Sequence, residues 1–285
     1  MEWNEGFDIG EVAGLAVART AAEGPCPFCH GEGRRAVEVE EKTVSRDARG
    51  KEVVSTEKVR RVYRCRCQRV PDRVALYNAA ELPARHAHCT METFKAELAR
   101  PTWSAVRKWL DTYQGGPEQL GLVLSGAPGR GKTHLLAAVV RELTFRYGAS
   151  VRFIEFSHLI ASIREGYDHD VGEARLLGPL VRVPVLAIDE LGKGRGSDFE
   201  STILDEIVSR RYNGHAGPLL ATTNFPLVAR PKKENDSLST GAMPSLAERL
   251  GERVWSRLKE SCLFVEATGE DYRVVHSHEK RGHKR

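Results

Sequence analysis

A short glycine-rich segment constrains the fold of this 285-residue chain more than any other part of its sequence. It follows the apolar run Gly121–Ser125 and precedes a stretch with helical spacing of apolar residues. Its letters fit the pattern G-x-x-x-x-G-K-[ST], in the order Gly126, Ala127, Pro128, Gly129, Arg130, Gly131, Lys132 and Thr133. Glycines let the backbone wrap around phosphate oxygens, and the first amides of a helix present positive potential to them. The pattern therefore predicts a phosphate-binding loop between a strand and a helix.

Three side chains at the end of this segment have expected roles in binding a nucleoside triphosphate. Lys132 is expected to contact the β- and γ-phosphates, and the Thr133 hydroxyl to ligate Mg²⁺. His134, the next residue of the predicted helix, completes the candidate cofactor-binding set that begins at Gly126. The alternative is a glycine-rich turn with Lys-Thr after it by chance.

Polar side chains follow two further apolar strands. Asp189 and Glu190 come after apolar residues 185–188, and Asn224 follows residues 219–223. In phosphate-loop enzymes the first acid supports Mg²⁺, and the second can orient and deprotonate the attacking water. Asn224 can hold that water against the γ-phosphate, although Asn also commonly caps strand ends. Beside the phosphate loop, the three residues predict hydrolysis of the triphosphate.

From about residue 74 onward, apolar strands alternate with amphipathic helices. This alternation predicts an α/β fold with a largely parallel sheet of five strands. Residues 230–244 are rich in Pro, Gly, Ser and Lys and predict a loop. The expected strands are Gly121–Ser125, Val151–Phe156, Val183–Asp189, Leu219–Thr223 and Cys262–Ala267.

The order of these motifs resembles the AAA+ ATPases of the DnaC/DnaI helicase-loader group, within the IstB-like ATP-binding superfamily. The resemblance covers about residues 90–275 and depends on GAPGRGKT, VLAIDE, LLATTN, GERVWSRL (Gly251–Leu258) and EDYR (Glu270–Arg273). It implies a P-loop AAA+ (ASCE) core that binds ATP. Only about 18 residues follow the last strand, so we expect no C-terminal helical lid. The same order appears in the IstB transposition helpers, with less agreement near Arg253–Arg257.

The resemblance also implies roles for three side chains. Asn224 matches the sensor-1 position, Arg257 the arginine finger and Arg273 the sensor-2 arginine. An arginine from a neighbouring subunit stabilises charge on the γ-phosphoryl oxygens, an effect often worth about 10³–10⁵ in rate. Arg253 lies one helical turn before Arg257 and can be the finger instead, and either can be a plain surface charge. Arg273 can act across a subunit boundary.

Four of the six cysteines form two close pairs, Cys26 with Cys29 and Cys65 with Cys67. Four thiolates suit a tetrahedral structural Zn²⁺ site without an open position. A segment this small also needs a metal to be stably folded. The alternatives are His30 in place of one thiolate, a redox dithiol, or unligated thiols. Between the pairs, β-prone residues 36–44 and 53–64 predict a hairpin.

Charge is unevenly distributed along a chain whose net charge is only +4. Residues 34–73 carry thirteen Lys or Arg against seven acids, so the cysteine segment is basic. The resemblance implies that this module docks onto a helicase, although its Arg-rich strands can instead contact DNA phosphates. The expected segments are a flexible lead with a short helix (1–25), a zinc-binding module (26–73), a linker that includes His86, His88 and Cys89 (74–100), the ATPase domain (101–275) and a basic tail (276–285).

The resemblance implies an ATPase that loads a replicative DnaB-type helicase and assembles on that helicase, on single-stranded DNA and on itself. Two alternatives are an IstB-like transposition helper acting on target DNA and a nucleotide-switched adaptor that hydrolyses little ATP. The acidic N-terminus does not read as a signal peptide, and no apolar run approaches the roughly 18 residues that span a bilayer. A cytoplasmic protein without a membrane partner is therefore expected.

Overall fold

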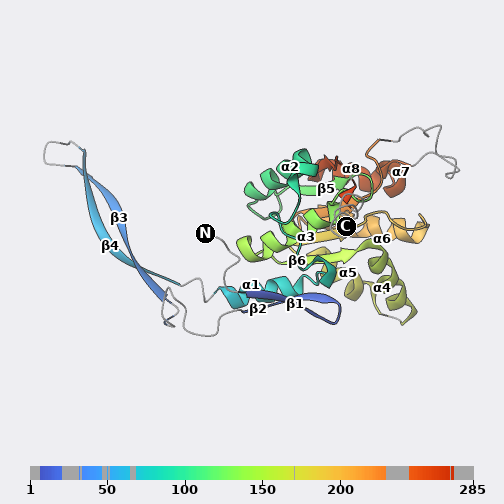
Figure 1. The fold of residues 1–285 in the computed structure, drawn as a ribbon, viewed down its shortest axis with the longest axis horizontal. Coiled ribbons are helices and arrows are strands. Elements are labelled where there is room, and N and C mark those ends of the chain that lie inside the picture. The colour runs from blue at the N-terminus through green and yellow to red at the C-terminus, as the bar shows by residue number, and fades with distance from the viewer. Residues whose placement is uncertain are drawn as a thin grey trace, which may run out of the picture. The chain divides into compact units, whose positions relative to one another are not determined.

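The computed structural model describes residues 7–20, 32, 34–46, 50, 52–64, 69–169, 171–228, 244–269 and 271–272. The chain divides into two compact units, Met1–Asp8 with Arg19–Ala75 and Ile9–Ala18 with Leu76–Arg285. Figure 1 shows the described elements. The strands are β1 (Phe7–Val12), β2 (Leu15–Thr20), β3 (Arg34–Arg46), β4 (Glu52–Arg64), β5 (Gly121–Ser125), β6 (Val151–Glu155), β7 (Val185–Asp189), β8 (Leu219–Thr223) and β9 (Cys262–Glu266). The helices are α1 (Val70–Ala79), α2 (Arg100–Asp111), α3 (Lys132–Glu142), α4 (Phe156–Asp168), α5 (Glu173–Arg182), α6 (Asp198–Asn213), α7 (Leu246–Leu250) and α8 (Glu252–Ser261), with 3₁₀ turns η2 (Ala84–His86) and η3 (Ala96–Leu98) and the π-helical segment η4 (Leu143–Tyr147).

The larger unit is built on a five-stranded parallel sheet, as the sequence predicts. Its strand order is β6-β7-β8-β5-β9, and each pair of neighbours is parallel. Every residue of β5, β7 and β8 is buried, which explains why these three strands read as continuous apolar runs. All five strands begin and end within two residues of the expected positions. The α/β fold class is confirmed.

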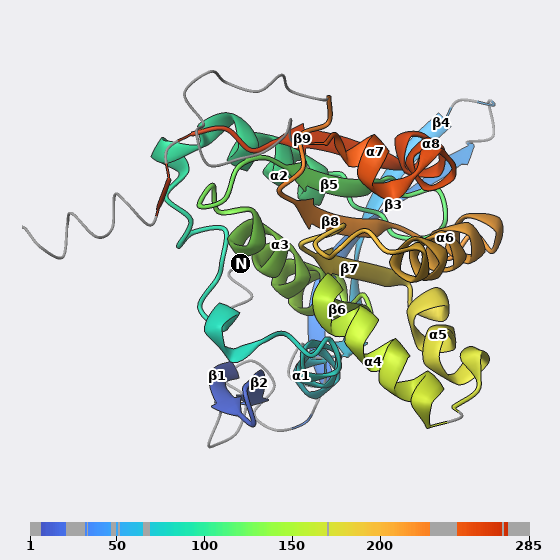
Figure 2. The same ribbon diagram turned by 90° about the vertical axis from the view of Figure 1, so that its right-hand side faces the viewer.

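Helices cover both faces of this sheet (Figure 2). Helix α3 packs against β7 and β8 and is apolar on nearly every side, so all residues from Leu135 to Val140 are buried. Helices α4 to α8 contribute to one core cluster with β7 residues Leu186 and Ile188. Within the described residues, no helix is both long and apolar enough to cross a membrane.

Strands β3 and β4 form the hairpin predicted between the cysteine pairs. They pair antiparallel over thirteen positions, from Arg34 opposite Arg64 to Arg46 opposite Glu52. Opposite charges face each other where Glu38 meets Arg60, an arrangement that stabilises neighbouring strands. The cysteine pairs themselves lie outside the described residues.

Residues 7–20 differ from the short helix expected within residues 1–25. They form the two strands β1 and β2, joined by Ala13 and Gly14 at φ values of 50° and 79°. Two consecutive left-handed residues make a tight turn, and the turn favours a hairpin over a helix. Alternate burial of Ala16 and Ala18 on β2 fits a strand, and Asn78 holds Ala18 by hydrogen bonds in both directions.

The expected linker is also different, because residues 76–99 belong to the folded core. Tyr77 and Leu82 are at most 1% exposed, and Met91 and Phe94 at most 6%. The Tyr77 ring stacks on Phe145, with ring centroids 4.8 Å apart. These apolar residues follow neither a helical nor a strand period, so a pattern search does not detect them.

Candidate nucleotide-binding site

The predicted phosphate loop joins β5 to α3. Gly131, the residue before α3, has φ 73°, and a Cβ at this position would lie 2.6 Å from the Phe94 ring. Only glycine accommodates both the left-handed backbone and this close approach. The loop amides and the first turn of a buried helix therefore meet at the carboxyl end of the sheet, where open α/β sheets bind ligands.

Lys132 is held inside the loop that precedes it. Its side chain is 6% exposed, and Nζ donates hydrogen bonds to the carbonyl oxygens of Gly126 at 2.7 Å and Ala127 at 2.8 Å. A buried ammonium group is stable only with such partners. The loop thus fixes one positive charge at the place where the sequence predicts phosphate binding.

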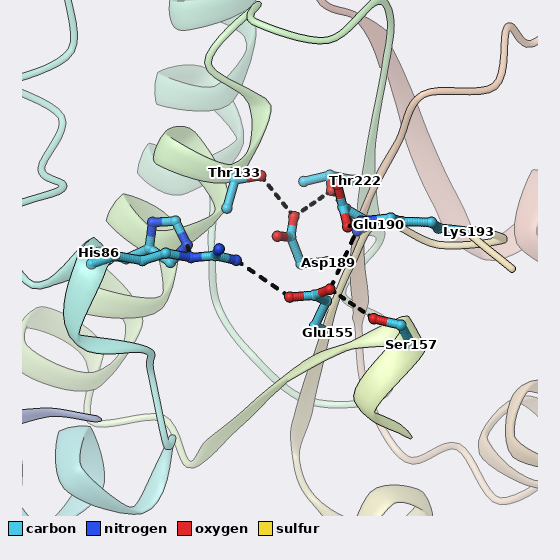
Figure 3. Close-up of polar contacts among 9 residues, drawn as sticks. His86, Thr133, Glu155, Ser157, Asp189, Glu190, Lys193 and Thr222 are labelled. Carbon is cyan, nitrogen blue, oxygen red and sulfur yellow. Dashed lines mark hydrogen bonds and ion pairs between the residues drawn. The ribbon is translucent and has the colours of Figure 1, made fainter. Parts of the chain in front are cut away.

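The carboxylate of Asp189 accepts two hydroxyl hydrogen bonds at one oxygen. Thr133 Oγ1 lies 2.9 Å and Thr222 Oγ1 2.5 Å from Asp189 Oδ1. Figure 3 shows both hydroxyl groups directed at this carboxylate. Asp189 is 1% exposed, and burial raises its pKa, while the two hydroxyl groups oppose that shift. A hydroxyl and a carboxylate at this distance are the hard oxygen ligands that Mg²⁺ prefers. The predicted pair Thr133 and Asp189 fits a magnesium ion.

Glu190 follows β7 with its backbone in the left-handed region, at φ 56°. Its amide donates to Thr222 Oγ1 at 2.9 Å, so one threonine orients both acids. The side chain is 28% exposed and forms an ion pair with Lys193. A non-glycine residue in this conformation is uncommon and recurs at functional sites.

A cavity of about 450 Å³ connects these groups. It brings together the predicted residues Lys132, Glu190 and Asn224. Its lining residues are His86, Cys89, Phe94, Pro128, Gly129, Arg130, Gly131, Lys132, Thr133, His134, Glu190, Thr222, Asn224 and Tyr272. Its size is within the range of small-molecule sites, and its position above the strand ends suits a nucleotide.

One wall of this cavity, which includes His86, Cys89 and Phe94, was not predicted from the sequence. His86 and Cys89 were expected to be linker residues. Burial lowers the pKa of His86 to about 4, so its ring is neutral at physiological pH, and burial raises the pKa of the Cys89 thiol to about 11. His134 Nε2 lies 2.9 Å from the Thr90 carbonyl oxygen, which ties α3 to this wall. In the sequence, the closeness of His86, His88 and Phe94 was the signal that could have predicted this wall of the cavity.

Arg257 and Arg253 do not line this cavity. The Arg257 guanidinium lies over the Tyr212 ring at 5.8 Å, and its Nη1 donates to the Arg253 carbonyl at 3.1 Å. The Arg253 side chain is 74% exposed and lies 3.6 Å from Asp205. Both arginines lie on α8, and neither lines the cavity, so the arginine finger stays a prediction.

Arg273 and the four predicted zinc ligands Cys26, Cys29, Cys65 and Cys67 lie outside the described residues. Tyr272, directly before Arg273, donates its amide to the Gly129 carbonyl at 2.9 Å. In the described part of the chain, no three His, Cys, Asp or Glu side chains are grouped as a metal site. Zinc binding therefore stays a prediction.

Known proteins are similar to this chain in sequence and in fold. The protein named replicative helicase loader DnaC of Escherichia coli (strain K12) is 27% identical over 201 residues, 69% of this chain and 74% of its own. Its namesake in Buchnera aphidicola subsp. Baizongia pistaciae (strain Bp) is 30% identical over 198 residues, 68% of this chain and 73% of its own. The crystal structure of the DnaC helicase loader aligns with a TM-score of 0.53 at 26% identity and covers 65% of this chain and 99% of its own.

These matches confirm the resemblance to the DnaC/DnaI group of AAA+ ATPases. The family described as IstB-like ATP binding protein matches residues 35–280. That range includes the β3–β4 hairpin except for its first residue, the phosphate loop and all five strands of the parallel sheet. The chain belongs to the family of IstB-like ATP binding proteins.

Proposed function

We propose that this protein is an ATP-dependent loader of a replicative DnaB-type helicase. The observation that carries the proposal is a cavity lined by Lys132, Thr133, Glu190 and Asn224 in a chain that is similar to DnaC. In this proposal the protein binds ATP with Mg²⁺ and assembles on the helicase, on single-stranded DNA and on itself. The basic module at residues 26–73, with its Zn²⁺, contacts the helicase.

In the proposed hydrolysis of ATP, residues at the ends of different strands have different roles. Lys132 and the loop amides bind the β- and γ-phosphates, and Thr133 and Asp189 would hold Mg²⁺, which would supply positive charge to those phosphates. Glu190 accepts a proton from the attacking water, which Asn224 orients. The arginine finger from a neighbouring subunit and Arg273 stabilise the charge that develops on the γ-phosphoryl oxygens. Turnover therefore depends on assembly.

The proposal is tested by forming a complex between the full chain and a DnaB-type helicase hexamer. We expect a stable complex with ATP and Mg²⁺, observed as a shift in mass by light scattering, and a weaker one with ADP. Lys132→Ala should lose ATP binding by about 100-fold or more, because it removes a buried charge from the phosphates. Lys108→Ala, an exposed change on α2, is the matched control.

A result in which the helicase never co-migrates with the protein would argue against the loader role. Binding to a transposase with target DNA would then favour the IstB-like transposition helper. A nucleotide-switched adaptor with little turnover is the second candidate, and the ion pair between Glu190 and Lys193 favours it. Formation of the helicase complex with ATP but no measurable phosphate release would support that adaptor.

The two candidate fingers are distinguished by replacing them separately. We expect Arg257→Ala to keep ATP binding and to lower turnover by about 10³-fold, the effect of removing a finger arginine. Arg253→Ala should lower turnover by less than about threefold, because its exposed ion pair with Asp205 contributes little. Phosphate release is measured at a protein concentration at which the wild type assembles. The reverse order of effects would assign the finger to Arg253.

A further inference from the structure

Lys193 is folded back onto the residue proposed as the general base. Its backbone amide donates to the Glu190 carbonyl at 2.9 Å, and its ammonium forms an ion pair with Glu190 Oε2. The chain reverses this sharply because Glu190 and Gly192 both have left-handed backbones, at φ 56° and 80°. One oxygen of the Glu190 carboxylate, in a residue that lines the cavity, is thus engaged by a cation.

A second carboxylate lies within reach of the same ammonium. Glu155, the last residue of β6, has its Oε1 3.9 Å from Lys193 Nζ. It is anchored by the Ser157 hydroxyl at 2.7 Å and by Arg85 at 3.3 Å. Figure 3 shows Glu155, Asp189 and Glu190 gathered at neighbouring strand ends, with Lys193 beside Glu190.

Both partners of Lys193 keep it charged. The hydrogen bond from Ser157 lowers the pKa of Glu155, so this carboxylate is ionised at neutral pH. The hydrogen bond to Glu190 raises the pKa of Lys193, which is therefore an ammonium. An ammonium group between two carboxylates can form an ion pair with either one. If the Lys193 ammonium moves from Glu190 to Glu155, it therefore keeps an anionic partner.

We propose that Lys193 is a positioning residue with two partners: it holds the Glu190 carboxylate in a resting arrangement, and Glu155 accepts it when Glu190 turns to the attacking water. The proposal rests on the proposed hydrolysis of ATP. A general base needs a carboxylate oxygen within hydrogen-bond reach of the water, and Lys193 competes for that oxygen. Lys193 thereby keeps turnover low in the unpartnered protein, and Glu155 makes its release possible.

The test measures steady-state phosphate release by the full chain at saturating ATP and Mg²⁺. Lys193→Met should raise kcat about two- to fivefold, the scale of a partly exposed ion pair, with KM for ATP unchanged. Glu155→Gln should lower kcat, because Lys193 then has a single anionic partner. The double variant should match Lys193→Met, because Glu155 acts only through Lys193 in this scheme.

A merely structural role predicts a different pattern, in which each single change lowers kcat or raises KM and the double variant is the worst. Lys108→Met, which removes an exposed lysine from α2, should leave kcat unchanged. An unchanged or lower kcat in Lys193→Met, beside an inactive Glu190→Gln, would overturn the positioning role alone. Full turnover by Glu190→Gln would instead overturn the proposed hydrolysis, and this inference with it.

Discussion

Replacing Glu190 with glutamine is expected to reduce ATP turnover by about 100-fold or more while ATP binding stays within about twofold of the wild type. The side-chain amide of glutamine has nearly the same shape as the carboxylate, so the left-handed backbone and the hydrogen bond from the backbone N–H of residue 190 to Thr222 should remain. The side-chain amide cannot accept a proton from water. Binding is measured with a fluorescent ATP analogue and turnover by phosphate release.

The matched control for this change is Glu206→Gln. Glu206 lies on α6, where it pairs with Arg210 and is 38% exposed, outside the cavity. Its replacement should leave both binding and turnover unchanged, since an exposed ion pair contributes at most about 1 kcal/mol. Retention of more than half of the wild-type turnover by Glu190→Gln would mean that another group activates the water.

Replacing Arg211 with methionine is expected to lower the free energy of unfolding by about 3–5 kcal/mol. Arg211 lies in the last turn of α6 and is 4% exposed. The four N–H groups of its two Nη atoms are shared among seven backbone carbonyl oxygens within hydrogen-bond distance. These carbonyls belong to residues 180–184 before β7 and 216–218 before β8. Although burial lowers its pKa to about 10, the guanidinium stays charged at neutral pH. Methionine would remove the guanidinium donors from these buried carbonyls.

Arg210→Met tests whether the position, rather than the loss of any arginine, matters. Arg210 is adjacent in the sequence but 42% exposed, in an ion pair with Glu206, so its loss should cost less than about 1 kcal/mol. Urea unfolding of the full chain followed by circular dichroism gives both values. Equal midpoints for the two variants would show that the carbonyl cluster is stable without Arg211.

The strands of the parallel sheet could be predicted to within two residues because the sequence of each strand shows where it begins and ends. Strands β5, β7 and β8 are buried on both faces, so they are short apolar runs that end at polar or glycine residues. The phosphate loop was equally predictable, since Gly126, Gly131 and Lys132 have chemical roles that few other residues can fill. Both signals are local, and tertiary contacts do not alter them.

Other parts of the site depend on contacts between distant segments. Thr222 orients both Asp189 and Glu190, but in the sequence it is one of two threonines at the end of an apolar strand. Phe94 packs against Gly131 and His134 from a segment that shows no periodicity. The contacts of Arg253 and Arg257 likewise depend on α6, which supplies Asp205 and Tyr212.

The sequence by itself determined the fold class, the phosphate loop and the order of acidic and polar strand ends, because spacing and residue chemistry suffice for each. The tertiary structure decided which neighbours these groups have. Only the folded chain brings Lys193 between Glu155 and Glu190, and only it turns residues 76–99 from an apparent linker into a wall of the cavity. The physical reason is that pairing and burial depend on distances across the sheet, and these are set by the packing of segments that lie far apart along the chain.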